Sequence, residues 1–386
     1  MAHHNTIMAQ MLKYISRHGF QSCVDAHCGD KRVRTMSCWT QFVAMLFGQI
    51  TQRKSLRDSV TALETATAFQ YHWGVGPVRR STLADANESR PNEIYADFFG
   101  KLYGHVSALT SKPRLRIKAP IRIFDASVVD LCLNLFDWAT FRETKAAVKL
   151  HTMFDLNSNV PSCVVITEAA VHETNIAWQQ EFDPGSFVIF DRGVLDYHWF
   201  AKLDAEDVFF VTRLKSNAAF KVLENRKAKP DKGVMKDQTI EFEGFYAYRS
   251  CPTPLRRVVI IDPESGEQLV FLTNAFHLAS LTIAKLYRAR WQVELFFKWI
   301  KQNLRVKTFF GTSPNAVKTQ IWIALIAYVL LAYVKYLAQS SLSLLDITRL
   351  VQMNLFRKLS LGDLLHRKFA RFKPPNVQNQ LAFQLL

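Results

Sequence analysis

The sequence predicts an α/β fold: a mixed five-stranded sheet with a β-rich insertion, preceded by one helical region and followed by another. Three observations support this prediction. Apolar residues recur at helical spacing over the first hundred or so residues, as in Trp39, Phe42, Val43, Leu46 and Phe47. From Ile121 the pattern changes to short β-rich runs, with helix-like sequence between the later ones. The length of 386 residues exceeds the usual single domain, so two or three domains are expected.

The first helical region is expected to span residues 1–115. Two capping boxes fall within it, at Ser55 to Asp58 and at Thr82 to Asp85. The second box follows Arg79 and Arg80, so a helix N-terminus with two arginines beside it would suit a DNA phosphate or groove. The alternative interpretation is an ordinary pair of solvated arginines.

A central region is expected over residues 116–310. Its five predicted strands cover 121–124, 148–154, 162–166, 186–190 and 208–213. The earliest runs are close enough to be antiparallel neighbours, whereas helix-like sequence between the last three favours parallel pairing. A β insertion is expected at 218–278, with a basic stretch followed by strand-like runs at 239–248, 255–261 and 269–273.

A helical C-terminal region is expected over residues 311–386, for dimerisation or DNA contact. Its wholly apolar segment, 321–334, is shorter than the roughly 20 residues that a membrane-spanning helix needs. We therefore predict a buried core helix that begins at the Ser313-Pro314 signal.

The charge balance predicts a polyanionic partner. The chain has 49 Lys and Arg against 33 Asp and Glu, which gives a formal net charge of +16. The N-terminal sequence predicts no signal peptide, and six cysteines occur without the paired spacing of a zinc site or the density of a secreted scaffold. The protein is expected in the bacterial cytoplasm, associated with the nucleoid, and without a membrane or small-molecule cofactor as partner.

Two aspartates follow apolar runs in the same way. Asp125 comes after Ile-Arg-Ile-Phe, and Asp191 comes after Phe-Val-Ile-Phe. In open α/β sheets the carboxyl ends of strands line the crevice where ligands bind, so both carboxylates are expected in one site. A single such Asp would be a turn former or helix cap, but two in one sheet favour a site for a hard divalent cation.

The third predicted element is a helix that contains Tyr287, Arg290, Glu294 and Lys301. At about 100° per residue these four side chains lie within an arc of roughly 60° on an otherwise apolar helix. Ionisable groups in such surroundings are costly unless they are paired or bound to a metal or phosphate. The helix alone leaves a second interpretation equally open, an ion-pair ladder built on the i, i+4 spacing of Arg290 and Glu294.

Together, Asp125, Asp191 and Glu294 suit two divalent ions about 3.5 to 4 Å apart, the arrangement that serves phosphoryl transfer. Tyr287, Arg290 and Lys301 are then expected to hold the DNA backbone. Arg213 and Lys215, at the end of the last predicted core strand, are further candidates for phosphate contact.

The spacing Tyr287-x2-Arg290-x3-Glu294-x6-Lys301 after Asp125 and Asp191 resembles the Tyr-Arg-Glu-Lys signature of bacterial DDE transposases of the insertion-sequence-four family. The Tn-five and Tn-ten transposases are better-known relatives. Segments 38–49 and 80–87 are also similar to that group, so the resemblance covers nearly the whole chain.

The resemblance implies a ribonuclease-H-like core and an end-recognition role for the first domain. It also implies Mg²⁺-dependent cutting at terminal inverted repeats, with Mn²⁺ as a substitute, and cut-and-paste movement by a homodimer on double-stranded DNA. Asp125, Asp191 and Glu294 would be the metal triad. Well-known members use a tryptophan of the insertion to hold a flipped base. This insertion has none, and the candidates to replace it are Phe242, Phe245, Tyr246 and Tyr248.

Two other functions fit parts of the pattern. A ribonuclease-H-like nuclease would need the carboxylates but not strand transfer, and the size of the chain and its helical N-terminal region argue against it. A catalytically idle DNA-binding protein derived from a transposase would not need three intact carboxylates.

Overall fold

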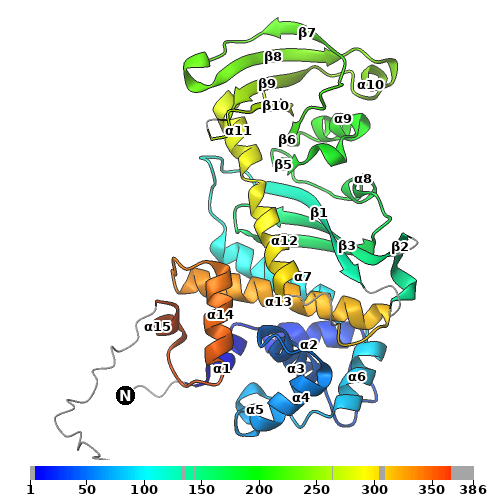
Figure 1. The fold of residues 1–386 in the computed structure, drawn as a ribbon, viewed down its shortest axis with the longest axis vertical. Helices are drawn as coiled ribbons and strands as arrows, with labels where there is room; N and C mark the ends of the chain where they lie inside the picture. Colours follow the sequence, from blue (N-terminus) through cyan, green and yellow to red (C-terminus); the bar gives the residue numbers. More distant parts are fainter. Residues whose placement is uncertain (1–4, 132–135, 143–144, 263, 304–308, 367–386) are drawn as a thin grey trace, which may run out of the picture.

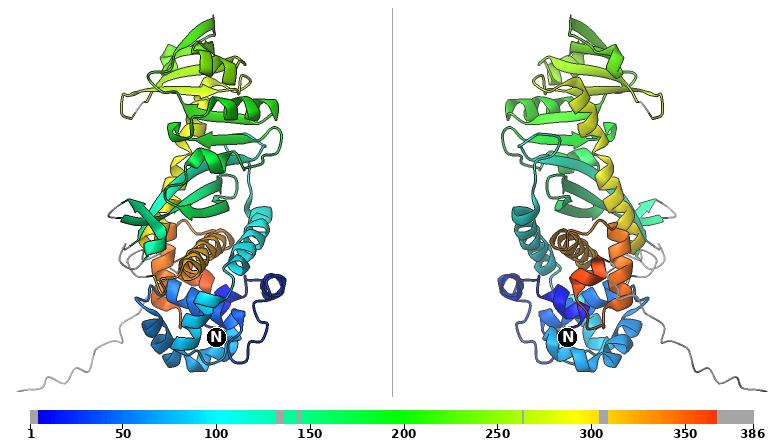
Figure 2. Two further views of the ribbon diagram at one scale, coloured as in Figure 1. Left: turned by 90° about the vertical axis from the view of Figure 1, so that its right-hand side faces the viewer. Right: turned by 90° about the vertical axis from the view of Figure 1, so that its left-hand side faces the viewer.

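The computed structural model of the chain describes residues 5–131, 136–142, 145–262, 264–303 and 309–366. Figure 1 shows an elongated molecule in which most helices gather at one end and a single sheet extends away from them. Figure 2 shows that helices lie on both sides of this sheet. The fold is therefore mixed α/β, as the sequence predicts.

Within the described residues, ten strands form one sheet. They are β1 (Ile121–Leu131), β2 (Thr140–Arg142), β3 (Lys145–Asp155), β4 (Val160–Glu168), β5 (Phe187–Phe190), β6 (Phe209–Arg213), β7 (Phe220–Asn225), β8 (Val234–Phe242), β9 (Leu255–Ile261) and β10 (Gln268–Thr273). Their order is β2-β3-β1-β5-β6-β10-β9-β8-β7, with β4 paired to β3.

All five predicted core strands are present. β1 pairs antiparallel with β3, and β3 pairs antiparallel with β4. β5 pairs parallel with β1, and β6 pairs parallel with β5. The first three of these strands follow each other closely in the sequence, which allows antiparallel pairing. One helix precedes β5 and another lies between β5 and β6, as parallel pairing requires.

The predicted insertion does not form a separate β unit. Its strand β10 pairs antiparallel with β6, so β7 to β10 continue the core sheet. The predicted run 239–248 ends early, because the chain after Phe242 turns into the short helix α10 (Phe245–Ser250). Strand β7 was not predicted, since its residues are mostly exposed and polar and lack an apolar alternation.

Helices surround the other parts of the molecule. The N-terminal ones are α1 (Ile7–Leu12), α2 (Arg17–Ala26), α3 (Cys38–Ile50), α4 (Leu56–Thr65), α5 (Thr67–Trp73), α6 (Arg80–Ser89) and α7 (Glu93–Thr110). Those beside the sheet are α8 (Glu173–Ala177), α9 (Tyr197–Ala205), α11 (Ser280–Arg288) and α12 (Trp291–Asn303). The last are α13 (Pro314–Leu337), α14 (Leu344–Asn354) and α15 (Leu361–Leu365).

The alternation of side chains along the central strands gives the sheet two apolar faces. Phe124, Phe190 and Phe210 pack on one face against side chains of α8 and α9. Ile123 and Ile189 point to the other face, where they join the core that includes α11, α12 and α13. Figure 2 shows α9 and the pair α11 and α12 on opposite sides. Burial on both faces explains why these strands are nearly all apolar.

The two predicted capping boxes have different outcomes. Ser55 is the N-cap of α4 and accepts a hydrogen bond from the backbone N–H of Asp58 at 3.1 Å. Thr82 is not a cap, because α6 already begins at Arg80 and Arg79 occupies the N-cap position. A hydroxyl and a carboxylate three residues apart are common inside helices too, which limits what this pattern can predict.

Helix α13 is the predicted buried core helix. Ser313 caps it by accepting from the N–H of Ala316, and Pro314 stands at its first position. The helix is long and apolar enough to cross a membrane by length and composition alone, yet 89% of its most apolar window is buried inside the protein. It packs on α3, α6, α7, α12 and α14, so it joins the two ends of the chain. Residues 367–386 of the expected C-terminal region lie outside the described residues.

Candidate active site

Asp191 follows directly on the buried strand β5. Its backbone leaves the sheet at the N-cap position of a short 3₁₀ turn, Arg192–Val194. Strand β5 is apolar because both faces of the sheet are covered, and it ends where the first charged residue occurs. The Asp191 carboxylate therefore lies at the carboxyl edge of the sheet.

Asp125 lies within a strand and not at its end, which corrects the sequence-based expectation. Strand β1 continues for six residues beyond it, to Leu131. The register nevertheless brings the two aspartates together, because the parallel pairing of β1 with β5 stops at Phe124 opposite Phe190. Asp125 is thus the first β1 residue whose edge is no longer covered by β5.

The predicted single helix of the signature residues is two helices. Tyr287 belongs to α11, Glu294 and Lys301 belong to α12, and Arg290 lies in the short break between them. The break is tightly wound, since the N–H of Arg290 donates to the carbonyl of Tyr287 and the N–H of Val293 donates to that of Arg290. The two helices still follow each other closely along one face of the sheet (Figure 1).

Arg290 bridges two of the three carboxylates. Its Nη1 donates to Oδ2 of Asp125 at 2.9 Å, and its Nη2 donates to Oε1 of Glu294 at 2.6 Å. The hydroxyl of Tyr287 donates to Oδ1 of Asp191 at 2.9 Å. Tyr287 and Arg290 thus contact the carboxylates in this structure and do not offer their polar atoms to DNA. The predicted ion pair of Arg290 and Glu294 is present, with Asp125 as an additional partner.

The electrostatics of the site depend on burial. Burial raises the pKa of Asp125 to about 6 against the lowering effect of the Arg290 charge, and the carboxylates of Glu173 and Asp191 raise it further. Burial also raises the pKa of the Tyr287 hydroxyl, and the adjacent Asp191 carboxylate adds to the effect. Tyr287 therefore remains a neutral hydrogen-bond donor at any physiological pH.

These residues line a cleft of about 530 Å³. Its lining is Asp125, Ala126, Ser127, Asp191, Arg290, Glu294, Phe297, Lys298, Lys301 and Gln302. Three carboxylates and three cations share this lining, and Lys301 is exposed. Lys298, Ser127 and Gln302 were not predicted from the sequence. The signal for Lys298 was its position four residues after Glu294, on the same side of the helix.

The donor set of the cleft suits a hard divalent cation, because three carboxylates from β1, β5 and α12 supply only oxygen atoms. Across the described ranges, however, no three Asp, Glu, His or Cys side chains are grouped as a metal site. The guanidinium of Arg290 lies between two of the carboxylates. The described cysteines are free thiols and none lines the cleft, and Cys132 lies outside the described residues.

The other predicted DNA contacts lie outside the cleft. Arg213 ends β6 and is close enough to Tyr287 for its charge to act on that hydroxyl, and Lys215 is exposed beyond it. Arg79 and Arg80 are exposed at the start of α6. Arg80 lines a separate basic cleft together with Lys54, Arg57 and other residues of the helical end.

The aromatic residues of the insertion separate into two groups. Phe242 is buried in the sheet and has no face to offer a base. On α10, Phe245 and Tyr246 are 72% and 83% exposed, with their ring centroids 5.5 Å apart. Tyr248 on the same helix is 47% exposed. The exposed aromatic surface of the insertion is therefore on α10.

Two segments of the chain match known protein families. Residues 116–330 match the family described as Transposase DDE domain, and residues 3–76 match a domain of unknown function (DUF4372). The putative transposase y4zB of Sinorhizobium fredii is 35% identical over 72% of this chain and 77% of its own length. A probable transposase for an insertion sequence element, IS5377, of Geobacillus stearothermophilus is 29% identical over 86% of both chains.

Two more distant similarities extend the comparison. A putative transposase for the insertion sequence element IS4SA of Synechocystis is 23% identical over 72% of this chain and 79% of its own. The piggyBac transposase in a synaptic complex with hairpin DNA aligns at a TM-score of 0.47 and 11% identity, over 97% of this chain and 83% of that chain.

Proposed function

The chain belongs to the DDE transposases, and from this membership we propose that Asp125, Asp191 and Glu294 are its metal-binding catalytic residues. The observation that carries the proposal is their convergence: β1, β5 and α12 each contribute one carboxylate to a single cleft. We propose two Mg²⁺ ions, with Mn²⁺ as a substitute, because this oxygen-only set suits hard cations. Both Asp125 and Glu294 already bind one shared cation, the guanidinium of Arg290.

Divalent ions, when bound, would lower the pKa of the attacking water or 3′-hydroxyl and neutralise charge on the leaving oxygen. The protein's own residues have separable roles in this proposal. Asp125 and Glu294 would exchange Arg290 for the metal, and Arg290 would then be free to bind a DNA phosphate. Tyr287 would hold the Asp191 carboxylate in place through its hydrogen bond. Lys298 and Lys301, on the same cleft wall, would position the DNA backbone.

The finer details form part of the same proposal. The strands β1, β3, β4, β5 and β6 would be a ribonuclease-H-like core, extended by the strands of 218–278. The helical residues 1–115 would recognise terminal inverted repeats, and residues 311–386 would support dimerisation or DNA contact. A homodimer on paired ends would then cut both ends and insert the element into target DNA. The basic charge of the chain and the relatives' descriptions as insertion-sequence transposases support this proposal.

The decisive experiment uses the DNA that flanks the coding region of the chain. Purified protein is incubated with this DNA and with Mg²⁺ or Mn²⁺, and the product ends are mapped by sequencing. We expect cuts at an inverted repeat and joining of the released 3′ ends to a second duplex. Asp191→Ala should abolish both products, because each carboxylate contributes several kcal/mol of transition-state stabilisation, or roughly a 10³-fold change in rate.

A matched control is Asp130→Asn, which removes an exposed carboxylate from the same strand as Asp125 but from the opposite side of the sheet. It should cut and join like the unmodified chain. Nicking without joining would favour the nuclease alternative. Unchanged cutting by the Asp191→Ala variant would exclude the proposed catalytic role of this residue.

A further inference from the structure

A second basic cavity lies at the opposite end of the parallel strands from the catalytic cleft. It has a volume of about 510 Å³ and is bordered by the linker 111–120, by the turn 157–160 that follows β3, and by the end of α13. Asp191 follows the carboxyl end of β5, and Asp125 lies where the parallel pairing of β1 with β5 stops, whereas this linker and this turn meet the amino end of β1. The cavity is therefore distinct from the cleft that contains the carboxylates.

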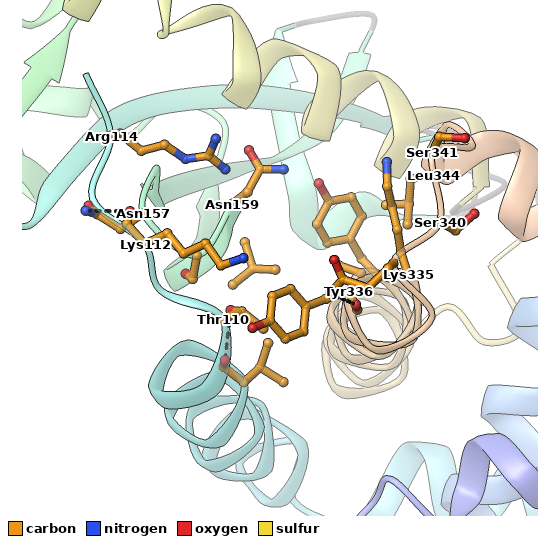
Figure 3. A pocket seen from close by; sticks show the side chains of 16 residues that line it. Thr110, Lys112, Arg114, Asn157, Asn159, Lys335, Tyr336, Ser340, Ser341 and Leu344 are labelled. Carbon is orange, nitrogen blue, oxygen red and sulfur yellow. Dashed lines mark hydrogen bonds between the residues drawn. The ribbon is translucent and has the colours of Figure 1, made fainter. Parts of the chain in front are cut away.

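Three cations from two parts of the chain line the cavity. Lys112 and Arg114 come from the linker and Lys335 comes from α13. Figure 3 shows Lys112 and Arg114 pointing into the cavity from one wall, with Lys335 on the opposite wall and the amide of Asn159 between them. No carboxylate belongs to the lining, and none of the three cations forms an ion pair with a described acidic residue.

The surroundings fix two of these cations in place. The ammonium of Lys112 lies 5.2 Å from the ring centre of Tyr336, and Nε of Arg114 donates to the carbonyl of Leu156 at 3.3 Å. The N–H of Lys112 also donates to the carbonyl of Asn157 at 3.2 Å. The Nη atoms of Arg114 and the ammonium of Lys112 remain available for a ligand.

Asp155 does not neutralise the cavity, although it ends β3 directly before the turn. Its carboxylate is buried and bound to Arg122 at 2.6 Å. The hydroxyls of Tyr103 and Ser158 donate to its Oδ2 as well, at 3.0 and 2.7 Å. The buried carboxylate thus holds the turn against α7 while its charge is already balanced.

The row of cations continues beyond the cavity. Arg116 and Lys118 are exposed on the same linker. The N–H of Ile117 donates to the carbonyl of Arg114 and closes a tight turn, in which Leu115 and Arg116 have positive φ angles of 52° and 64°. A row longer than a single small anion favours a polymer with regularly spaced charges.

We propose that this cavity and the linker row bind backbone phosphates of duplex DNA, without regard to sequence and outside the catalytic cleft. This inference rests on the proposed function in one respect, that the chain binds DNA. Phosphate contacts by Lys and Arg release counterions, so each contact adds about 0.9 to the slope of log affinity against log salt concentration.

The test compares two variants with the same loss of charge. The cavity variant carries Lys112→Gln, Arg114→Gln and Lys335→Gln. The control variant carries Lys221→Gln, Lys236→Gln and Lys285→Gln, three exposed cations of β7, β8 and α11. Binding of a fluorescent duplex is measured by anisotropy from about 50 to 200 mM salt, the range over which phosphate contacts change affinity strongly.

We expect the cavity variant to lose about 2 to 3 from the salt slope, or about 1 for each contact removed, equally on an inverted-repeat duplex and on an unrelated one. The control variant should keep the slope of the unmodified chain. The charge-preserving double variant Lys112→Arg with Lys335→Arg should also keep it, and thermal unfolding of all variants shows whether they remain folded.

The change in salt slope caused by the cavity variant should add to the change caused by removing cations from the cleft. Lys298→Gln with Lys301→Gln removes two cleft cations, and its slope change should sum with that of the cavity variant if the two surfaces are independent. An unchanged slope in the cavity variant would overturn this inference while leaving the proposed function intact. Absence of DNA binding by the unmodified chain would instead overturn the proposed function.

The last measurement tests whether inorganic phosphate alone binds in the cavity. If the cavity is a site for a small anion, phosphate should bind the unmodified chain in a calorimeter and fail to bind the cavity variant, while both show the same DNA salt slope. That result would also overturn the inference.

Discussion

At the scale of single residues, Arg290 determines the state of the site. It pairs with both Asp125 and Glu294 through one guanidinium, and it stands in a break between helices where its backbone is held by short-range hydrogen bonds. Since a shared cation already joins these two carboxylates, a divalent metal at the proposed site would have to compete with it. Metal binding should therefore depend on both the protonation of Asp125 and the identity of residue 290.

The first prediction concerns pH. Because burial raises the pKa of Asp125 to about 6, this carboxyl is ionised at pH 7.5 and mostly protonated at pH 5. Because the pKa of Asp125 in the folded protein lies above the ordinary value of 3.8, this carboxyl takes up a proton as the pH falls through about 6. Mn²⁺ affinity, measured by calorimetry, should fall about tenfold per pH unit below 6. An affinity that stays constant down to pH 5 would contradict this.

The second prediction concerns Arg290→Ala. Removal of the guanidinium leaves Asp125 and Glu294 without their cation, so the pKa of Asp125 should rise above its value in the unmodified chain. The midpoint of the pH dependence of Mn²⁺ binding should therefore move to higher pH. Arg290→Lys keeps the charge but lacks the rigid planar fork that reaches both carboxylates, so its midpoint should lie between those of the other two proteins. Identical midpoints in all three proteins would show that Arg290 does not control Asp125.

Part of the site could be predicted from residues alone. Asp191 was recognisable because a charged residue directly after an all-apolar strand marks a sheet edge. The position of Asp125 was not, because β1 continues in its pairing with β3 beyond the point where its pairing with β5 stops. The bridge from Arg290 to Asp125 joins residues 165 positions apart, and no local spacing could reveal it. The ion pair of Arg290 with Glu294 could be predicted from their i, i+4 spacing alone.

At the scale of elements, a buried ion pair fastens the insertion to α11. Asp237 on β8 and Arg256 on β9 are both almost fully buried and contact each other at 2.6 Å. Arg256 also donates to the carbonyl of Leu278, and Ser280 at the start of α11 donates to Asp237 at 2.7 Å. Since α11 carries Tyr287, which donates to Asp191, the insertion is connected through this anchor to a carboxylate of the proposed catalytic site.

The third prediction tests the anchor. Arg256→Met leaves the Asp237 carboxylate buried and without its main partner, so unfolding free energy should fall by about 3 to 5 kcal/mol. The double variant with Asp237→Leu should recover most of that loss, as matched apolar pairs often do. Urea unfolding followed by fluorescence measures both. Equal stability of the single and double variants would contradict the argument.

The pKa of Asp237 in the same anchor is shifted in the opposite direction to that of Asp125. Burial opposes ionisation of Asp237, but hydrogen bonds from Arg256 and Ser280 and the nearby positive charges outweigh it and lower its pKa below 3.8. The stabilisation is therefore complete above pH 4 and disappears as the pH falls through the folded-state pKa.

Helices and strands with a strongly apolar sequence could be predicted, and exposed ones could not. Strand β5 and helix α13 stand out because burial on all sides makes nearly every residue apolar, and β9 stands out by its apolar run 258–261. Strand β7 and the break at Arg290 do not, because β7 is an exposed edge strand and the break lies within an otherwise helical pattern. That the insertion continues the core sheet follows from the pairing of β6 with β10, which sequence separation hides.

At the scale of the whole molecule, α13 holds the chain together. It contacts α3, α6 and α7 from the N-terminal region and α12 from the catalytic part. Its residues Leu325 and Leu330 are fully buried. A helix with no polar face cannot be stable in water by itself, so the N-terminal helices and the sheet depend on a segment that is translated near the end of the chain.

The fourth prediction follows from this dependence. A chain that ends at residue 310 should expose the surface that α13 covers and should aggregate on expression, as judged by size-exclusion chromatography of the soluble fraction. Co-expression of residues 311–386 should restore a soluble complex. A soluble, folded 1–310 fragment would show that α13 is an appended helix and not part of the core.

The balance of charges in the catalytic cleft bears on the order in which the complex assembles. Asp125, Asp191 and Glu294 are opposed by Arg290, Lys298 and Lys301, so the lining has no net charge near neutral pH. An approaching phosphate therefore meets no electrostatic barrier at a cleft that three bare carboxylates would have closed to it. Under the proposed function, the cleft would engage DNA before any divalent ion arrives, and the metal would then be a trigger for chemistry in an assembled complex and not a condition for assembly.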